Sequence, residues 1–114
     1  MALIRWRDLH ARKHPELGLL YHCPNGGFRN AREGARLKRM GVQAGIPDYC
    51  LPVARMPYHG AYFELKAKDG RMTDTQFEWL ITLIAQDYWA QVVYGWVEAA
   101  KAICSYLGIE GISP

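Results

Sequence analysis

The sequence has few cysteines, no C-x-x-C pair and no long apolar run. Its three cysteines, Cys23, Cys50 and Cys104, lie far apart in a chain of 114 residues. An odd number at wide spacing indicates neither a zinc site nor a disulfide framework, and favours buried free thiols in a reducing compartment. Without a run of about eighteen apolar residues we expect no membrane span. Because charge appears as early as Arg5, we expect no secretory signal and a cytoplasmic protein.

Internal repeats, low-complexity segments and linkers are also absent, which predicts a single domain over residues 1–114. The net charge of +3 is small but unevenly spread. Residues 1–45 hold nine Lys and Arg against three Asp and Glu, whereas residues 46–114 hold five against eight. An ordinary solvated surface could show the same bias. If the second part of the chain holds an acidic metal centre, however, the basic residues 1–45 would bind the phosphates of a nucleic acid.

Hydrophobic periodicity and turn residues divide the chain into helices and strands. We expect helices near residues 2–13, 30–40, 74–87 and 97–107, and strands near 19–23, 47–53, 61–67 and 90–96. This order predicts an α/β fold with a mixed four-stranded sheet flanked by helices. The short connection over 54–60 suits an antiparallel hairpin. The apolar stripe of the third helix consists of Phe77, Leu80, Ile81 and Ile84.

Two acidic residues and a lysine stand out on the two central predicted strands. Asp48 begins one strand, and Glu64 and Lys66 project from the same face of the next because they are two positions apart. Two carboxylates beside an ammonium can hold Mg²⁺ or Mn²⁺ together with an attacking water. Taken alone, Asp48 could be a turn residue, and Glu64 and Lys66 an exposed ion pair.

Pro47-Asp48 followed by Glu64-Leu65-Lys66 resembles the PD-(D/E)xK nuclease signature. The flanking segments sharpen the resemblance: Pro24-Asn25-Gly26-Gly27-Phe28-Arg29, Gly45-Ile46-Pro47-Asp48, Gly70-Arg71-Met72-Thr73 and Gln76. Their order and spacing, over about residues 19–107, resemble the VRR-NUC (virus-type replication-repair nuclease) branch. The resemblance implies a restriction-endonuclease-like PD-(D/E)xK core of order αβββαβ. One helix would be inserted after the first strand and one added at the end.

The resemblance also implies roles for individual residues. Asp48 and Glu64 would bind Mg²⁺ or Mn²⁺, with the carbonyl of Leu65 as a further ligand, and Lys66 would be catalytic. The matching glutamine, Gln76, would belong to the active site. Here Gln76 also stands three positions after Thr73, where it can complete a helix-capping box. The two roles compete for one side chain, and we favour the active site.

Several basic and turn residues are candidates for contact with DNA. Glycines at a turn let the backbone approach a phosphate, and arginines can pair with one. A tight turn and a solvated helix face are the structural alternatives. The candidates are Asn25, Gly26, Gly27, Arg29, Arg32, Arg36, Arg39 and Arg71.

One departure from the family concerns a third acid. Many relatives carry Glu or Gln near the start of the first helix, upstream of the segment matching Ala2 to Trp6. Either that group is dispensable, or the start is shortened, or Glu33 or another residue replaces it.

The resemblance implies a metal-dependent endonuclease that acts on DNA in a bacterial or phage-infected cell. We expect it to resolve four-way (Holliday) junctions as a homodimer, through exposed aromatics of the last strand and first helix. The alternatives are a flap or nicking nuclease on other branched DNA, and an inactive nucleic-acid-binding module.

Overall fold

The computed structural model describes residues 1–24, 30–112 and 114 of the chain. Its helices are α1 (Ala2–His10), the 3-10 helix η1 (Pro15–Leu19), α2 (Ala31–Arg39), α3 (Asp74–Ala85) and α4 (Trp96–Leu107). Its strands are β1 (Tyr21–His22), β2 (Tyr49–Leu51), β3 (Ala61–Lys66) and β4 (Trp89–Tyr94). The predicted order of helices and strands is confirmed. The first strand is shorter than expected, because η1 takes up the residues before it.

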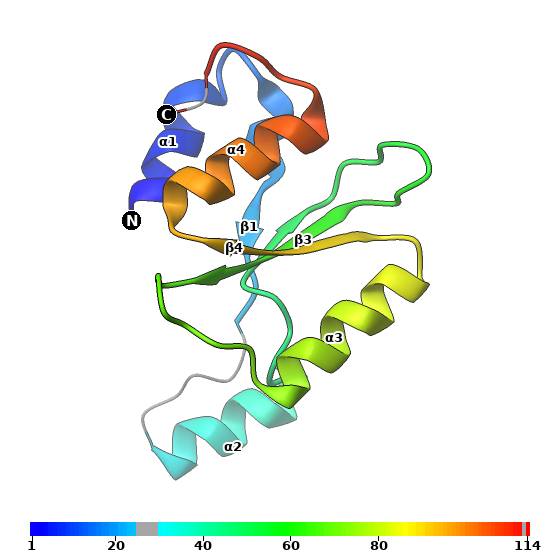
Figure 1. Cartoon of the computed structure of the whole chain (residues 1–114). Coiled ribbons are helices and arrows are strands. Elements are labelled where there is room, and N and C mark those ends of the chain that lie inside the picture. The colour runs from blue at the N-terminus through cyan, green and yellow to red at the C-terminus, as the bar shows by residue number, and fades with distance from the viewer. Residues whose placement is uncertain (25–29, 113) are drawn as a thin grey trace.

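The four strands form one mixed sheet in the order β1-β2-β3-β4. β1 and β2 pair antiparallel, as do β2 and β3, which confirms the predicted hairpin. β3 and β4 pair in parallel because α3 carries the chain across one face of the sheet between them. The helices α1 and α4 cover the opposite face (Figure 1). β4 therefore forms one edge of the sheet.

The main core lies between the sheet and the pair α1 and α4. Leu3, Leu51, Phe63, Val93 and Ile103 are all essentially inaccessible to solvent there. The odd-numbered residues of β3 and β4 face the α1 and α4 side of the sheet, so the even-numbered residues, Glu64 and Lys66 among them, face the α3 side. The sequence pattern thus places the acidic residues on the less covered face of the sheet.

The predicted apolar stripe of α3 is only partly correct. Leu80 is buried, but Phe77, Ile81 and Ile84 are 56%, 52% and 55% exposed, and the other buried residue of the helix is Leu83. The reason is position: α3 packs against the edge strand β4, so only a narrow strip of the helix meets the sheet. The remaining apolar residues form an exposed row.

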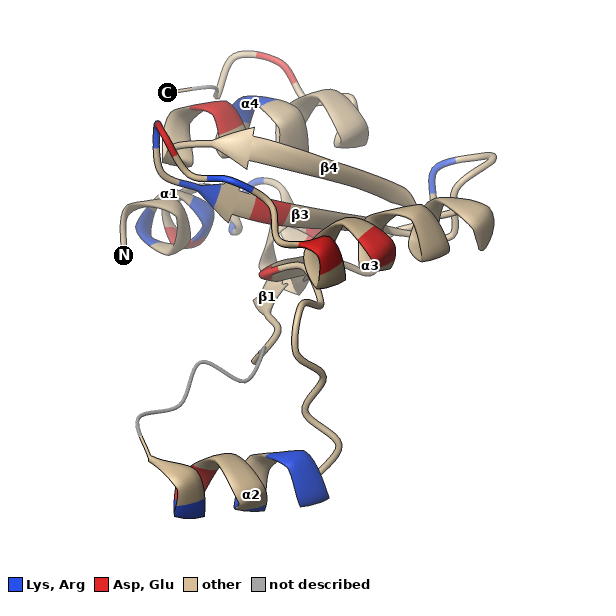
Figure 2. Cartoon of the chain, turned by 60° about the horizontal axis from the view of Figure 1, so that its bottom comes forward, with Lys and Arg blue, Asp and Glu red and all other residues tan. Residues whose placement is uncertain are grey.

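The helix α2 stands apart from the sheet (Figure 2). Asn30 caps it, because the Asn30 side-chain oxygen accepts a hydrogen bond from the backbone N–H of Glu33 at 2.8 Å. It ends before Gly41, whose φ of +93° glycine adopts readily. Both boundaries confirm the prediction. Within the part of the chain that the structure describes, neither α2 nor any other helix is long and apolar enough to cross a membrane.

Candidate functional site

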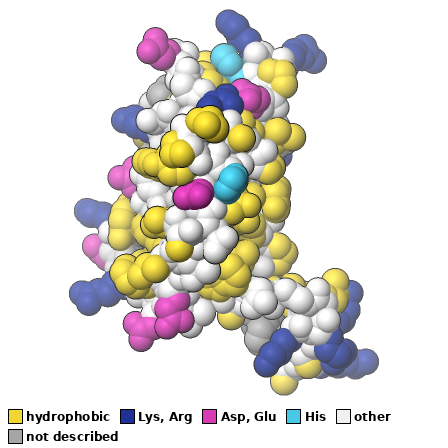
Figure 3. All heavy atoms as spheres, turned by 90° about the vertical axis from the view of Figure 1, so that its right-hand side faces the viewer, with side chains coloured by type: hydrophobic (Ala, Val, Ile, Leu, Met, Phe, Trp, Pro, Cys, Tyr) yellow, Lys and Arg dark blue, Asp and Glu magenta, His cyan; other side chains and the backbone are white. Residues whose placement is uncertain are grey.

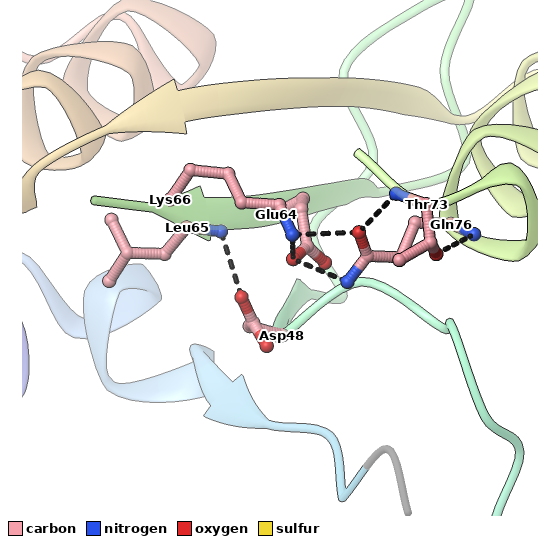
Figure 4. A network of polar contacts seen from close by, with 6 residues as sticks. All are labelled: Asp48, Glu64, Leu65, Lys66, Thr73 and Gln76. Atoms are coloured by element: carbon pink, nitrogen blue, oxygen red, sulfur yellow. Dashed lines mark hydrogen bonds and ion pairs between the residues drawn. The ribbon is translucent and has the colours of Figure 1, made fainter. Parts of the chain in front are cut away.

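Asp48 and Glu64 lie opposite each other on neighbouring strands. Tyr49 pairs with Phe63 in the β2–β3 register, so the preceding residue Asp48 stands across from Glu64. Asp48 Oδ2 accepts a hydrogen bond from the backbone N–H of Leu65 at 2.9 Å, which fixes its carboxylate against β3 (Figure 4). The two acids that the sequence analysis selects are therefore brought together.

Glu64 is the only buried charged residue in the described part of the chain, with 2% of its surface exposed. Its Oε2 atom lies 3.3 Å from Lys66 Nζ and 3.2 Å from Gln76 Nε2. Its Oε1 atom is buried and has no hydrogen-bond partner among the described residues. Burial, and then the negative charge of Asp48, raise the pKa of Glu64 to about 7, although Lys66 opposes the shift. A buried acid with an unpartnered oxygen is suited to a cation.

Gln76 performs both of the roles that the sequence sets in competition. Its Oε1 atom accepts from the backbone N–H of Thr73 at 3.0 Å, and the backbone N–H of Gln76 donates to Thr73 Oγ1 at 3.2 Å, which completes the capping box. The same Oε1 atom accepts from Lys66 Nζ at 2.7 Å. Because its amide nitrogen reaches Glu64, Gln76 ties the start of α3 to both charged side chains of β3 (Figure 4).

The donor set fits a hard divalent cation with oxygen ligands. The N–H and C=O of a strand residue point to the same side, so the Leu65 carbonyl faces the β2 side of β3, as its N–H does. Asp48, Glu64 and this carbonyl are oxygen donors of the kind that Mg²⁺ and Mn²⁺ accept. The described residues contain no group of three or more His, Cys, Asp or Glu able to hold a metal, so Glu33 does not join the pair.

The arginine stripe lies away from the acidic pair. Arg32, Arg36 and Arg39 are exposed on α2, where they line a shallow pocket of about 370 Å³ with Asn30 and Glu33. Figure 3 shows Lys and Arg side chains gathered on this projecting helix at the bottom of the molecule. Arg71 is exposed in the loop between β3 and α3, on the chain segment that joins Lys66 to Gln76. The four other DNA-contact candidates, Asn25, Gly26, Gly27 and Arg29, lie outside the described residues.

Two tyrosines that the sequence analysis passes over share the sheet face of the acids. Tyr21 of β1 and Tyr62 of β3 both stand beside Cys50 in the strand register. Tyr62 is two positions before Glu64, so its side chain points to the same face. The alternation of side chains along the strand that holds Glu64 could have identified Tyr62 from the sequence. The expected aromatic contribution of the first helix to an exposed surface is wrong, because Trp6 is buried and its indole donates to the carbonyl of Ile112.

Comparison with known proteins identifies the family. The VRR-NUC domain model matches residues 5–96 of the chain. A solved structure described as a VRR_NUC domain protein is similar over 97% of this chain and 91% of its own, with a TM-score of 0.75 and 28% sequence identity. No curated protein matches. The chain belongs to the VRR-NUC domain family, whose fold is of the PD-(D/E)xK nuclease type, and this membership implies a nuclease that binds DNA.

Proposed function

We propose that this protein is a Mg²⁺- or Mn²⁺-dependent endonuclease that hydrolyses DNA phosphodiester bonds. The observation that carries the proposal is Glu64, a buried carboxylate with one unpartnered oxygen among the described residues, opposite Asp48. Burying a carboxylate in this way is costly unless a cation or proton neutralises it.

Asp48, Glu64 and the Leu65 carbonyl would hold the metal, which when bound supplies positive charge to the phosphate and lowers the pKa of a water. The ammonium of Lys66 is ion-paired with Glu64 and so lies beside the proposed metal ligands. It would stabilise negative charge that develops on the phosphate. Gln76 would hold the Lys66 ammonium in position through its 2.7 Å hydrogen bond. The Leu65 N–H orients the side chain of Asp48.

The preferred substrate in this proposal is a four-way DNA junction cut by a homodimer. A junction has two-fold symmetry, and paired cuts require two sites related by a two-fold axis. The exposed row of Phe77, Ile81 and Ile84 belongs to α3, the helix that packs against the edge strand β4, and Tyr94 of β4 is 45% exposed. An exposed apolar surface beside an edge strand is suited to a second copy of the chain.

The test is cleavage of a labelled four-way junction and its matching linear duplex with Mg²⁺, Mn²⁺ or chelator. Lys66→Ala serves as the inactive control. We expect metal-dependent symmetric cuts in the junction alone, which disappear in the control. Equal cleavage of the duplex would leave the nuclease and remove junction specificity. Cleavage of flaps or nicked branches in place of the junction would favour the alternative substrates. Binding without cleavage under every condition would favour an inactive binding module.

A further inference from the structure

One sheet face carries a row of aromatic side chains directly beside the acidic pair. Along β1, β2 and β3, Cys23, Asp48 and Glu64 stand side by side, because Cys23 N–H donates to the Asp48 carbonyl and Asp48 lies opposite Glu64. Two positions along the strands, the neighbouring row consists of Tyr21, Cys50 and Tyr62. Two strand rises separate adjacent rows by roughly 6.6 Å. The row that contains the tyrosines is therefore the row of side chains next to the proposed site of cleavage.

The aromatic row continues beyond the strands. The Tyr62 ring packs edge-on against Tyr88, with centroids 5.5 Å apart, and the Tyr88 ring packs against His59 at 5.7 Å. The rings thus form a continuous series from β3 to the end of the β2–β3 connection. Tyr21 completes the row at the other side, with 49% of its surface exposed.

The rings of Tyr21 and Tyr62 stand on either side of one buried residue. Both tyrosines lie opposite Cys50 in the strand register, and Cys50 is 4% exposed. Because both tyrosines belong to paired strands, their backbones are already fixed when a ligand packs on the rings, which lowers the entropic cost of binding. An anchored aromatic with an exposed flank is the kind of surface on which a nucleobase stacks. Simple covering of the sheet would not require Tyr21 to remain half exposed.

We propose that Tyr21, Tyr62 and Tyr88 form a stacking site for the nucleotide adjacent to the phosphate being cut. This inference rests on the proposed function, because the tyrosines lie beside a phosphate being cut only if the neighbouring acids cleave DNA. A base can lie against these rings only if it has left its own stack. The row would therefore favour DNA whose bases next to the cut are unpaired or easily unstacked, as at a branch point.

The test uses a single-stranded oligonucleotide in chelator, so that binding is measured without cleavage. Tyr21→Ala should weaken binding by about five-fold or more, which corresponds to the loss of one base–aromatic stack. Tyr21→Phe should bind like the wild type because it keeps the ring. Tyr58→Ala is the matched control: Tyr58 packs on Trp89 and Tyr106 in the pocket beside α4, away from this face. Wild-type binding by Tyr21→Ala, or equal losses in Tyr21→Ala and Tyr21→Phe, would overturn the proposal.

A second measurement locates the stacked base. Single bases are removed in turn from one strand of the junction, and affinity for the wild type and Tyr21→Ala is compared at each position. The wild type should lose affinity when the base beside the cut is absent, and Tyr21→Ala should be indifferent to that loss. Equal sensitivity of both proteins at every position would refute the stacking site. Both experiments measure binding and not cleavage. A wild type without nuclease activity would therefore contradict the proposed function but leave the test of Tyr21 valid.

Discussion

The Gln76 Oε1 atom lies 2.7 Å from Lys66 Nζ and 3.0 Å from the backbone nitrogen of Thr73. One amide oxygen therefore both caps α3 and holds the lysine of the site. The Gln76 side chain therefore links the first turn of α3 to both Lys66 and Glu64. This coupling can be tested by separating the cap from the site.

Thr73→Ala and Gln76→Ala should both destabilise the protein through loss of the cap, but only Gln76→Ala should reduce cleavage. Both remove the capping box, so each should lower the free energy of unfolding by about 1 kcal/mol. Only Gln76→Ala also removes the contacts with Lys66 and Glu64, so only that variant should lose most cleavage activity. Chemical denaturation and junction cleavage measure the two effects. Equal activity in the two variants would assign Gln76 to the cap alone.

The stability of the metal-free protein should fall as pH rises from about 4.5 to about 7. Burial and the charge of Asp48 raise the pKa of Glu64 from 4.5 to about 7, so within this window the folded protein retains a proton that the unfolded chain has released. The free energy of unfolding must then decrease with pH. Denaturation in chelator at several pH values checks the slope, and Glu64→Gln should show a flatter one. A wild-type slope no steeper than that of Glu64→Gln would contradict the assignment.

Divalent metal should reverse this loss above pH 7. Binding to the folded state alone raises the free energy of unfolding by about 2.7 kcal/mol at a hundred times the dissociation constant. We expect Mn²⁺ to raise the melting temperature of the wild type, and Asp48→Asn to abolish the shift. Cys104→Ser, a buried residue of α4 on the far side of the sheet, provides a control that should retain the shift. An undiminished Mn²⁺ shift in Asp48→Asn would remove Asp48 from the metal site.

The acidic pair was predictable from sequence because strand alternation and hairpin pairing are short-range rules. Two residues of spacing place Glu64 and Lys66 on one face, and the short connection brings β2 beside β3. The dual role of Gln76 was not predictable, because it depends on the distance between the start of α3 and the end of β3. A local motif gives the cap, but only the fold gives the contact with Lys66.

The exposure of α3 was missed for a similar reason. A period of 3.6 residues marks Phe77, Ile81 and Ile84 as apolar, but not whether a partner within the chain covers them. The helix lies over the edge strand, so part of its apolar face extends beyond the sheet. Similarly, the arginine pattern of α2 gives a basic face without revealing that the helix stands away from the acids (Figure 2).

The arginines of α2 should contribute to affinity through salt-dependent contacts with phosphate. Replacing Arg32, Arg36 or Arg39 with Gln should each reduce the slope of log affinity against log salt by about 1, uniformly across DNA sequences. Arg55→Gln is a suitable control, because Arg55 is paired with Glu16 at 2.7 Å. Titrations of junction DNA at several salt concentrations, in chelator, measure the slopes. If the α2 variants keep the wild-type slope, the stripe is a solvated face.

The exposed row of α3 should be required for paired cuts but not for hydrolysis itself. Ile81 is 52% exposed at the centre of the row, and its replacement by Lys places a charge where a second copy would pack. Ile81→Lys should be a monomer in light scattering at micromolar concentration and should nick single strands of the junction without coordinated cuts.

Leu9→Lys controls for the loss of an exposed apolar residue, because Leu9 is 75% exposed on α1, across the sheet from α3. This variant should remain a dimer and cut both strands. A wild type that is monomeric at these concentrations would remove the homodimer. A dimeric Ile81→Lys would move the interface to another surface.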